Sequence, residues 1–544
     1  SWFRFRSFLP GYEFHEAFIN VDIDVAQGYG YFETLQFENY LNYQRSFGLH
    51  NVDVVAGTSY RSTASEFAGG STSSIPDEVK FDPYWQFIDA GVDTMDLSYG
   101  NAGVDYALIS YFGRVMYDYD GKYLFSATLR RDGSSNFGPN NRWGLFPSFS
   151  AGWVITEEPF FSADPVSFLK LRASWGKNGN DRIAPLAFAS TIQNVFTYPF
   201  GLSQALARGA ALATPPNPNI KWEESIQFDL GVELRMFDDK LTAEFDYYQK
   251  TTSDLLMNQI IPGYLGATND PISNLGEIRN EGIEAMIGYR VSLGKVKLSA
   301  NFNYTTFTNE VTRVAGETGF LQGYSWPVRN TPITRMSEGF PVGHFVGYVA
   351  DGIFQSQQEV FSHINSQGDP LQPNASPGDI RFLDINGDGV IDSEDITDIG
   401  SPWPDHILGL TLSGSAGGFD FSLILSAQLG HDIYRTYERS DITFTNYQTF
   451  WLDRWTPENP GNTYPRLVSN DPNNNQRPSS FYVEDASFLR LRNLQVGYNL
   501  PSSLLEKVRL KGLRLYFSAN NLITVTGYNG FDPDIGTNGW ILDT

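Results

Sequence analysis

The chain has 544 residues, 41% of them hydrophobic and 15% aromatic, and it contains no cysteine. Its formal net charge of −24 would repel a nucleic acid, which argues against DNA or RNA as a partner. The lack of cysteine excludes a disulfide scaffold and thiolate metal sites.

The hydropathy of the chain argues against a transmembrane helix. No run of about 18 apolar residues occurs. The first residues, SWFRFRSFLPGYEF, lack the basic start and apolar core of a signal peptide. A mean hydropathy of −0.29 is typical of a soluble protein. It is equally typical of a membrane β-barrel, whose strands are apolar on one face only.

Strict alternation of apolar and polar residues is the dominant pattern along the chain. In 115–131 it continues through an Asp-Gly pair that predicts a tight hairpin turn. In 225–251 it runs on both sides of a DDK turn, with Ile, Phe, Leu and Val at every second position. The same alternation occurs in 170–176, 294–307 and 418–428. Each stretch predicts a β-strand with one apolar and one polar face.

The length of the strands and of their connections predicts a barrel. We count roughly 15 strands, most of about 9–15 residues, whereas globular strands average about 5–6 and bilayer-crossing strands need about 9–11. Short turns alternate with long polar loops, which is the arrangement of outer-membrane proteins. The long loops are predicted at 62–103, 178–221, 310–341, 350–404 and 432–484. The predicted fold is therefore an all-β, antiparallel transmembrane β-barrel. The alternative is a large soluble β-protein, for example a secreted protein that binds or cleaves glycans.

One long loop, 350–404, contains the acidic stretch DINGDGVIDSED, which has the spacing of an EF-hand calcium loop. Gly389 is at the position where such a loop turns sharply. The predicted ligands are the side chains of Asp384, Asn386, Asp388 and Asp392, the carbonyl of Val390, and Asp395, which closes the site. No helix pair is predicted around it, so the expected role is a structural calcium ion that orders an external loop. The alternative is a solvated acidic turn.

Aromatic residues in the long loops are the candidates for substrate contact, because their flat faces stack on sugar rings and also hold peptides. They are Trp85, Phe320, Tyr324, Trp326, Trp403, Trp451 and Trp455. Packing within the loops is the alternative for each of them. We predict substrate contact for Tyr324 and Trp326, and we expect Trp451 and Trp455 to pin a loop.

Charged residues on the polar strand faces are expected to point into the barrel lumen, where the alternative to substrate contact is a structural polar lining. They are Arg130, Arg172, Asp229, Glu233, Arg235, Glu244, Asp246, Glu284 and Arg290. No catalytic site is predicted. The six histidines show no metal-protease or triad spacing, and chance pairs are inevitable among 62 acidic residues.

Several longer blocks of sequence are distinctive, among them LKLRASWGKNGN, PGDIRFLDINGDGVIDSEDITDIGSPWP, RWTPENPGNTYPRL and VEDASFLRLRNLQVGYNLP. Together these blocks closely resemble the barrel of the SusC/RagA family of TonB-dependent outer-membrane transporters. They occur in the family's order along the chain at 110–153, 169–180, 274–284, 377–404, 454–467, 483–501 and 513–535.

This resemblance implies a 22-stranded barrel with an N-terminal plug and a segment that engages TonB. It also implies a SusD-like surface lipoprotein as partner and the import of oligosaccharides or peptides across the outer membrane of a Bacteroidota-type bacterium. The chain departs from the family pattern, because no plug, TonB-binding segment or last strand is recognisable. We therefore expect 1–544 to be the barrel domain of a longer polypeptide. A passive porin or a scaffold barrel in a larger envelope complex remains the alternative.

Overall fold

The main feature of the structure, a computed structural model, is one antiparallel sheet of 15 strands. The structure describes residues 2–9, 12–15, 18–20, 23–73, 75, 87–91, 98–202, 204–316, 319–326, 331–437, 446–468, 470–506 and 510–534. In sheet order the strands are β1 (Trp2–Leu9), β4 (Asp24–Phe47), β5 (His50–Thr72), β6 (Ser98–Tyr119), β7 (Tyr123–Ser134), β8 (Trp143–Val154), β9 (Val166–Asn180), β12 (Glu223–Met236), β13 (Leu241–Asn258), β14 (Ile272–Leu293), β15 (Val296–Val314), β24 (His406–Ala416), β25 (Phe419–Leu429), β28 (Phe488–Asn499) and β29 (Arg514–Thr526). The antiparallel all-β fold agrees with the sequence-based prediction.

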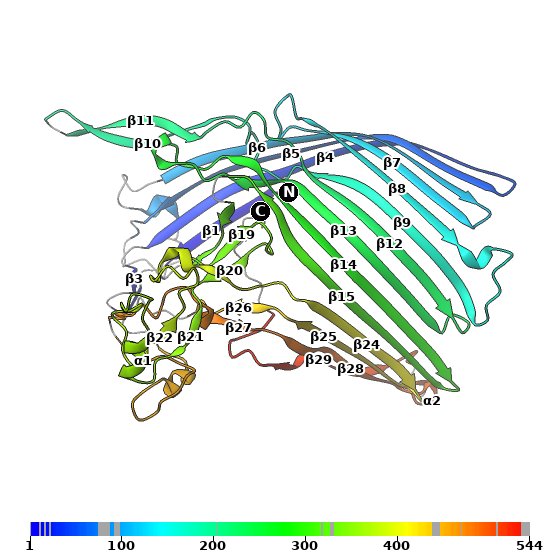
Figure 1. Cartoon of the computed structure of the whole chain (residues 1–544). Coiled ribbons are helices and arrows are strands. Elements are labelled where there is room, and N and C mark those ends of the chain that lie inside the picture. Colours follow the sequence, from blue (N-terminus) through cyan, green and yellow to red (C-terminus); the bar gives the residue numbers. More distant parts are fainter. Residues whose placement is uncertain are drawn as a thin grey trace.

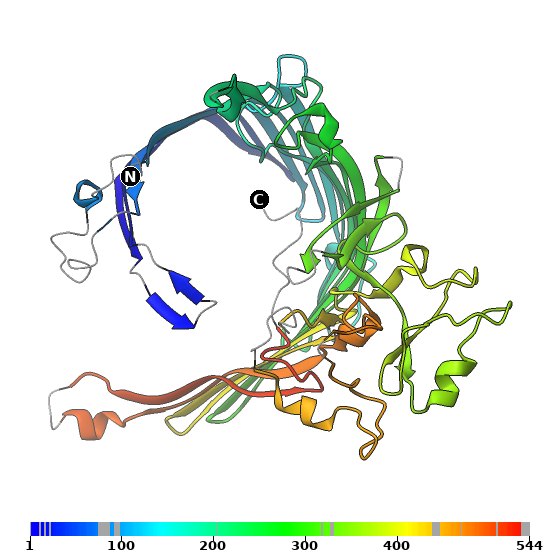
Figure 2. The ribbon, with the colours of Figure 1, turned by 90° about the vertical axis from the view of Figure 1, so that its left-hand side faces the viewer.

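This sheet curves into the wall of a barrel, with β1 and β29 at its two edges (Figure 2). The tight turns lie at one end of the wall, the right-hand end in Figure 1. At the turn between β6 and β7, Asp120 and Gly121 have φ angles of 54° and 67°, which is the backbone that a two-residue hairpin turn requires. The hairpin predicted from the Asp-Gly pair is therefore confirmed.

The two faces of the wall have opposite chemistry. On β12, Ile226, Phe228 and Leu230 are exposed by 38%, 40% and 51% on the apolar face. Polar side chains alternate with them, and Asp229 accepts a hydrogen bond from Ser174 Oγ at 2.8 Å. This polar face is the concave one, because residues of seven neighbouring strands, β4 to β9 and β12, enclose a single cavity of about 620 Å³ there. An apolar exterior around a polar interior is the pattern of a membrane barrel.

Six of the wall strands are longer than expected. β4, β5, β6, β13, β14 and β15 have 18–24 residues. A bilayer needs only about 9–11 residues per tilted strand, so these strands continue as paired ribbons beyond the apolar band. The loop predicted at 62–103 is therefore wrong in its bounds, because β5 reaches Thr72 and β6 begins at Ser98.

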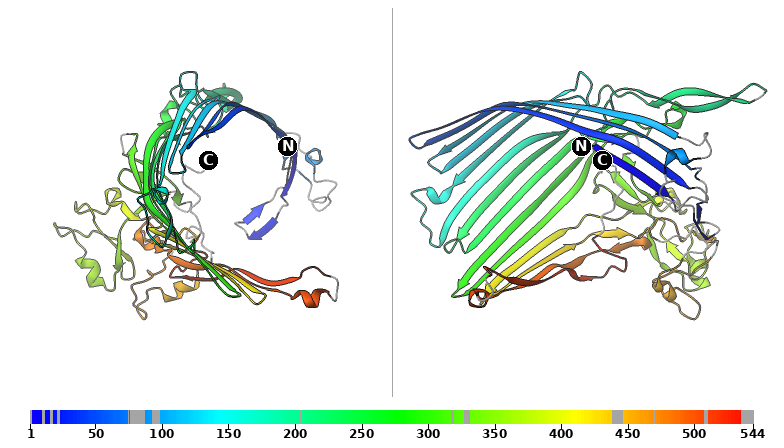
Figure 3. Two further views of the ribbon diagram at one scale, coloured as in Figure 1. Left: turned by 90° about the vertical axis from the view of Figure 1, so that its right-hand side faces the viewer. Right: turned by 180° about the vertical axis from the view of Figure 1, so that it is seen from behind.

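The long connections are at the end of the wall opposite the tight turns, as predicted, and they have secondary structure of their own. Their strands are β2 (Tyr12–His15), β3 (Phe18–Asn20), β10 (Thr191–Phe200), β11 (Ala205–Thr214), β16 (Phe320–Gln322), β17 (Ser325–Trp326), β18 (Thr331–Pro332), β19 (Thr334–Ser337), β20 (His344–Gly347), β21 (Ala350–Ile353), β22 (Ile380–Phe382), β23 (Thr397–Gly400), β26 (Asp432–Tyr434) and β27 (Val483–Asp485). The β10–β11 hairpin, within the predicted 178–221 loop, projects beyond the wall (Figures 1 and 3).

Helices are few and short in the described part of the chain, and none of them is long and apolar enough to cross a membrane. The α-helices are α1 (Gln357–Ser362) and α2 (Ser502–Leu505), and the 3-10 helices are η3 (Ile88–Ala90), η4 (Ile155–Glu157), η5 (Gly263–Leu265), η6 (Ser393–Asp395), η7 (Thr449–Asp453) and η8 (Ser480–Tyr482).

Two of the long connections fold together into one unit, which we call the loop module. It consists of the described residues in 319–405, between β15 and β24, and in 430–487, between β25 and β28. The loops predicted at 310–341 and 350–404 therefore belong to a single connection. Trp326, Phe345 and Tyr482 form the centre of its largest apolar cluster and are each no more than 3% exposed. The module thus has a hydrophobic core of its own outside the barrel wall, like that of a water-soluble protein.

Candidate functional site

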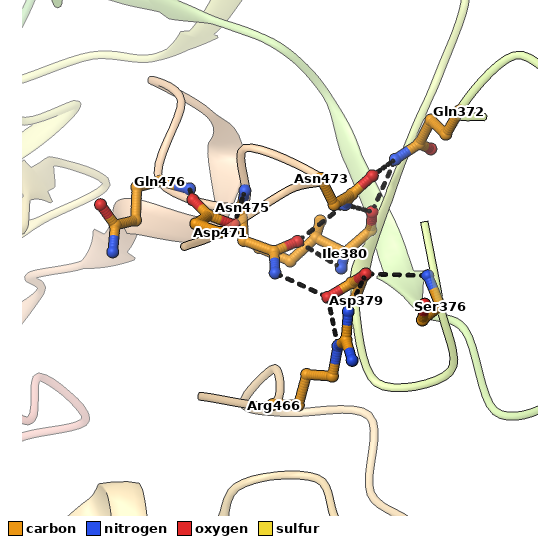
Figure 4. Close-up of polar contacts among 9 residues, drawn as sticks. All are labelled: Gln372, Ser376, Asp379, Ile380, Arg466, Asp471, Asn473, Asn475 and Gln476. Atoms are coloured by element: carbon orange, nitrogen blue, oxygen red, sulfur yellow. Dashed lines mark hydrogen bonds and ion pairs between the residues drawn. The ribbon is translucent and has the colours of Figure 1, made fainter. Parts of the chain in front are cut away.

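The two connections of the loop module are joined by a buried ion pair (Figure 4). Asp379 is fully buried, and Arg466 donates two hydrogen bonds to it, from Nε to Oδ1 at 2.7 Å and from Nη2 to Oδ2 at 2.9 Å. Asn475 Nδ2 donates to Oδ1 at 2.9 Å, and the Ser376 amide donates to Oδ2 at 2.8 Å. The carboxylate is therefore satisfied on both oxygens, which is what allows a charge to remain stable in an interior.

The polar network continues on the far side of Asn475. Gln372 Nε2 donates to the Ile380 carbonyl and to Asn473 Oδ1, both at 2.9 Å. Asn475 Oδ1 accepts hydrogen bonds from the Ile380 amide at 2.9 Å and from Asn473 Nδ2 at 2.8 Å. Fully paired buried networks of this kind hold segments in one arrangement. Segments about 90 residues apart in the sequence are thereby fixed against each other.

The sequence analysis did not predict this buried ion pair, although its two residues lie in sequence blocks that carry the family resemblance. Asp379 belongs to the PGD of 377–379, and Arg466 to the PRL of 465–467. The glycine of the first block has a structural reason. Gly378 has a φ of 93°, and a Cβ there would lie 2.4 Å from the Trp455 ring.

A cavity of about 240 Å³ lies beside the Asp379–Arg466 ion pair, within the loop module. Arg466 and Asn475 form part of its wall, so the network that bonds them also fixes the cavity. The other lining residues are Trp326, Tyr437, Asn446, Tyr447, Gln448, Trp451, Pro465, Leu467, Val468, Asp471, Gln476 and Tyr482. Aromatic rings and side-chain amides predominate among them.

The two residues predicted to contact substrate are found beside this cavity, in the apolar cluster of the module. Trp326 is only 1% exposed, its indole N–H donates to the Thr436 carbonyl at 3.3 Å, and one edge of it lines the cavity. Tyr324 packs against the same cluster and is partly buried. The packing of Trp326 gives it a structural role, and substrate contact by either residue stays a prediction.

The other loop aromatics that the structure describes contact neighbouring residues of the chain. Trp455 is 9% exposed and donates to Gln355 Oε1 at 3.1 Å, so the prediction that it pins a loop is confirmed. Trp403 donates to the Val342 carbonyl at 2.7 Å. Phe320 lies under the guanidinium of Arg335, at 4.4 Å from the ring centre. Trp85 lies outside the described residues.

The acidic stretch 384–395 forms a compact loop that is bonded to itself. Asp384 accepts hydrogen bonds from the Gly387 and Gly389 amides at 2.7 and 2.8 Å. Gly389 has a φ of 93°, so the turn expected at this position is present. Asp395 is fully buried, and it accepts hydrogen bonds from the backbone amides of residues 385, 386 and 392. Asp395 is thus a capping residue of η6, a role that needs no ion.

The fit of this loop to calcium is mixed. Its carboxylate, amide and carbonyl oxygens are of the type and in the order that Ca²⁺ requires. In the described part of the chain, however, no three acidic or histidine side chains come close enough together to hold a metal ion. The predicted calcium site stays a prediction.

A chain of hydrogen bonds with the order of a catalytic triad also occurs in the loop module. His344 Nδ1 is 2.7 Å from Asp398 Oδ1, and His344 Nε2 is 3.1 Å from Ser337 Oγ. His344 is 3% exposed and stacks on Phe340. None of these residues lines a cavity of the described structure that we identified, and a triad needs a substrate cavity. We therefore interpret the arrangement as a structural tie between β19, β20 and β23.

Four of the nine charges predicted for the lumen, namely Arg172, Glu233, Glu244 and Asp246, pair with one another along the wall. Arg172 is 2.7 Å from Asp246 and 3.4 Å from Glu233, and Lys170 is 3.0 Å from Glu233. Arg130 is 2.8 Å from Asp132. Arg172 and Asp229 line the 620 Å³ cavity. The structural polar lining is therefore present within the wall itself.

Comparison with known proteins gives one consistent result. The family model described as "TonB dependent receptor-like, beta-barrel" matches residues 3–522. The TonB-dependent receptor P3 of Formosa agariphila is 35% identical over 91% of this chain and 48% of the relative. The TonB-dependent receptor SusC of Bacteroides thetaiotaomicron is 29% identical over 96% of this chain and 50% of the relative. The chain thus spans about half the length of the curated relatives it matches.

A solved structure of the RagAB peptide transporter superposes with a TM-score of 0.78 over 98% of this chain and 56% of that chain, at 24% identity. At this identity the likeness establishes the fold. Together with the family match over nearly the whole sequence, it shows that the chain belongs to the TonB-dependent receptor-like β-barrel family.

Proposed function

We propose that the protein imports oligosaccharides or peptides across the outer membrane. The observation that carries this proposal is the wall itself, which is apolar outside and whose inner face carries paired charges and a cavity of about 620 Å³. The loop module and the β10–β11 hairpin lie at the end of the wall opposite the tight turns (Figure 1), where the module provides a surface for capturing solutes. Members of this family are integral proteins of the outer membrane and act as transporters rather than enzymes.

The proposed energy source is TonB, and the proposed partner is a SusD-like surface lipoprotein. The names of the relatives, TonB-dependent receptors from two organisms, support the first assignment. The likeness of fold to the RagAB transporter supports the second. Both partners would act at opposite ends of the wall, TonB at the end with tight turns and the lipoprotein at the loop module.

An uptake assay tests this proposal. Cells that carry the protein are given labelled neutral oligosaccharides or short peptides, with TonB present or deleted. We expect uptake of one class of solute to require both the protein and TonB. Equal uptake without TonB would instead support a passive porin, and no uptake of either class would overturn import.

We also propose that Ca²⁺ binds at 384–395 through the oxygens of Asp384, Asn386, Asp388 and Asp392, with the Val390 carbonyl and Asp395. The order of oxygen donors supports this proposal. Calorimetric titration of the purified protein with CaCl₂ should show one site, and Asp388→Ala should remove it without changing the barrel. Binding that is absent, or unchanged in the variant, contradicts the proposal.

A further inference from the structure

The 240 Å³ cavity of the loop module has a wall suited to a ring-shaped neutral solute. Trp326, Tyr447, Trp451 and Tyr482 come from three segments of the loop module and line the same space. Tyr447 is 55% exposed, so its ring is available from the outside. Aromatic faces bind the C–H face of a sugar or another flat apolar surface.

The charges around the cavity argue against an anionic occupant. Arg466 is the one cation among the described lining residues, and two of its N–H groups are already bonded to Asp379. Asp471 also lines the cavity and accepts hydrogen bonds from the Asn475 and Gln476 amides. Because Asp379 balances the charge of Arg466 from behind the wall and Asp471 adds a carboxylate to the lining, a sulfated or acidic solute would be repelled.

The polar groups of the wall are those that recognise hydroxyl groups. Asn446, Gln448 and Gln476 carry side-chain amides, which both donate and accept hydrogen bonds, as sugar hydroxyls do. The indole N–H of Trp451 has less than 1 Å² exposed and has no acceptor among the described residues. Five other tryptophan N–H groups, those of Trp153, Trp222, Trp326, Trp403 and Trp455, do have acceptors.

The size of the cavity limits its occupant. Drug-sized ligands occupy cavities of about 300–1,000 Å³, so a volume of about 240 Å³ is suited to one ring of a longer molecule. The wall is also rigid, because Asp379 fixes Arg466 and Asn475 from behind. A site that is ordered before binding loses less entropy when it is filled.

We propose that this cavity binds one uncharged sugar unit of an oligosaccharide, an inference that rests on the proposed import of such solutes. Tyr447 provides the stacking face, the indole N–H of Trp451 donates to a hydroxyl, and the side-chain amide of Gln448 bonds a second hydroxyl. The loop module is thereby a capture site outside the membrane wall.

Binding to the detergent-purified protein tests this inference. The probes are neutral trisaccharides of glucose, galactose, mannose and xylose, and neutral tripeptides serve as the competing class. We expect at least one trisaccharide to bind, and Tyr447→Ala to weaken it roughly three- to tenfold, the loss of one aromatic contact. Trp451→Phe, which keeps a ring but lacks the N–H, should weaken the same trisaccharide.

A matched control is Tyr264→Ala, because Tyr264 is 87% exposed in another long connection and does not line the cavity. This variant should bind as the unchanged protein does. Trisaccharide binding that is unaffected by Tyr447→Ala, or tripeptide binding that Tyr447→Ala abolishes, overturns the inference. Uptake is measured separately in cells, so a failure of import and a failure of this site are distinguished.

Discussion

The barrel wall and the loop module are built from the same chain with opposite hydrophobic patterns. In the wall, large apolar side chains such as Leu41 and Phe37 are 81% and 62% exposed. In the loop module, Phe345 and Phe354 are 1% and 0% exposed. The wall is surrounded by lipid and the module by water, so each part places its apolar groups where its own solvent requires them.

The two parts also hold together in different ways. The wall is a continuous ladder of backbone hydrogen bonds, and neighbouring strands such as β4 and β5 pair over their whole length. The module has short strands, and side chains do much of the joining, with the Asp379–Arg466 pair at its centre. Side-chain substitutions should therefore disturb the module locally, while the wall should respond mainly to changes on its lipid face.

The largest effect is expected at the buried ion pair. Asp379→Ala leaves Arg466 unpaired beside a buried network, and such losses cost about 3–5 kcal/mol. We expect the module to become sensitive to protease while the barrel keeps its heat-modifiable migration in gels. The matched control is Asp351→Ala, because the Asp351–Arg381 pair is at 2.8 Å but Asp351 is 51% exposed. Its loss should cost less than about 1 kcal/mol, and equal effects of the two variants would contradict the distinction.

A charge on the lipid face should have the next largest effect. Leu230→Arg places a cation midway along β12 and should destabilise the barrel by about 2–4 kcal/mol. Gln227→Arg, on the lumenal face of the same strand, should be tolerated. Unfolding in urea from lipid vesicles measures both. If the lumenal variant were the more damaging, the assignment of the two faces would be wrong.

A smaller difference in stability is expected between substitutions of two tryptophans of the loop module. Trp455→Phe removes an N–H that is bonded to Gln355, whereas Trp451→Phe removes one without an acceptor among the described residues. The first substitution should cost about 1 kcal/mol more than the second, since both lose the same ring volume. Protease resistance of the module at increasing denaturant concentration gives the comparison.

The smallest effect should come from pH. Burial lowers the pKa of His363 from its ordinary value of 6.5, and its Nε2 is 3.1 Å from the Phe382 carbonyl. A lowered histidine pKa stabilises the fold above about pH 6.5, and this contribution is lost as the pH falls through the folded pKa. The protection of the β22 amides from hydrogen exchange, corrected for the intrinsic pH dependence of exchange, should therefore fall in acid. His363→Gln should remove this dependence, while the corrected protection of the β12 amides should be the same at both pH values and in both proteins.

Much of the wall could be predicted from sequence, because its period of two is local and direct. The alternation around Ile226 and the Asp-Gly turn at 120–121 identified strands and a hairpin that the structure contains. The ends of the strands were harder to predict, because the extensions of β5 and β6 beyond the membrane carry no apolar band. The pattern of residues 62–72 therefore looked like a loop.

The loop module could not be predicted in the same way, because its contacts join distant segments. Nothing local relates Asp379 to Arg466, or Ser337 to Asp398 through His344. Trp326 is an aromatic residue in a long loop, which suggested contact with substrate. In the structure it is enclosed by β20 and by residues more than 100 positions away. Burial in an irregular segment is set by tertiary packing, which the sequence pattern does not display.

The attachment of the loop module has a mechanical consequence. Its two connections leave the wall at β15 and β25 and return at β24 and β28, which are four adjacent strands of the sheet. Because Asp379 and Arg466 join the two connections, a pulling force on either one is shared among four anchor points. A partner that pulls on the loop module would therefore distribute the force over the ends of all four strands and would not separate a single hairpin from the sheet.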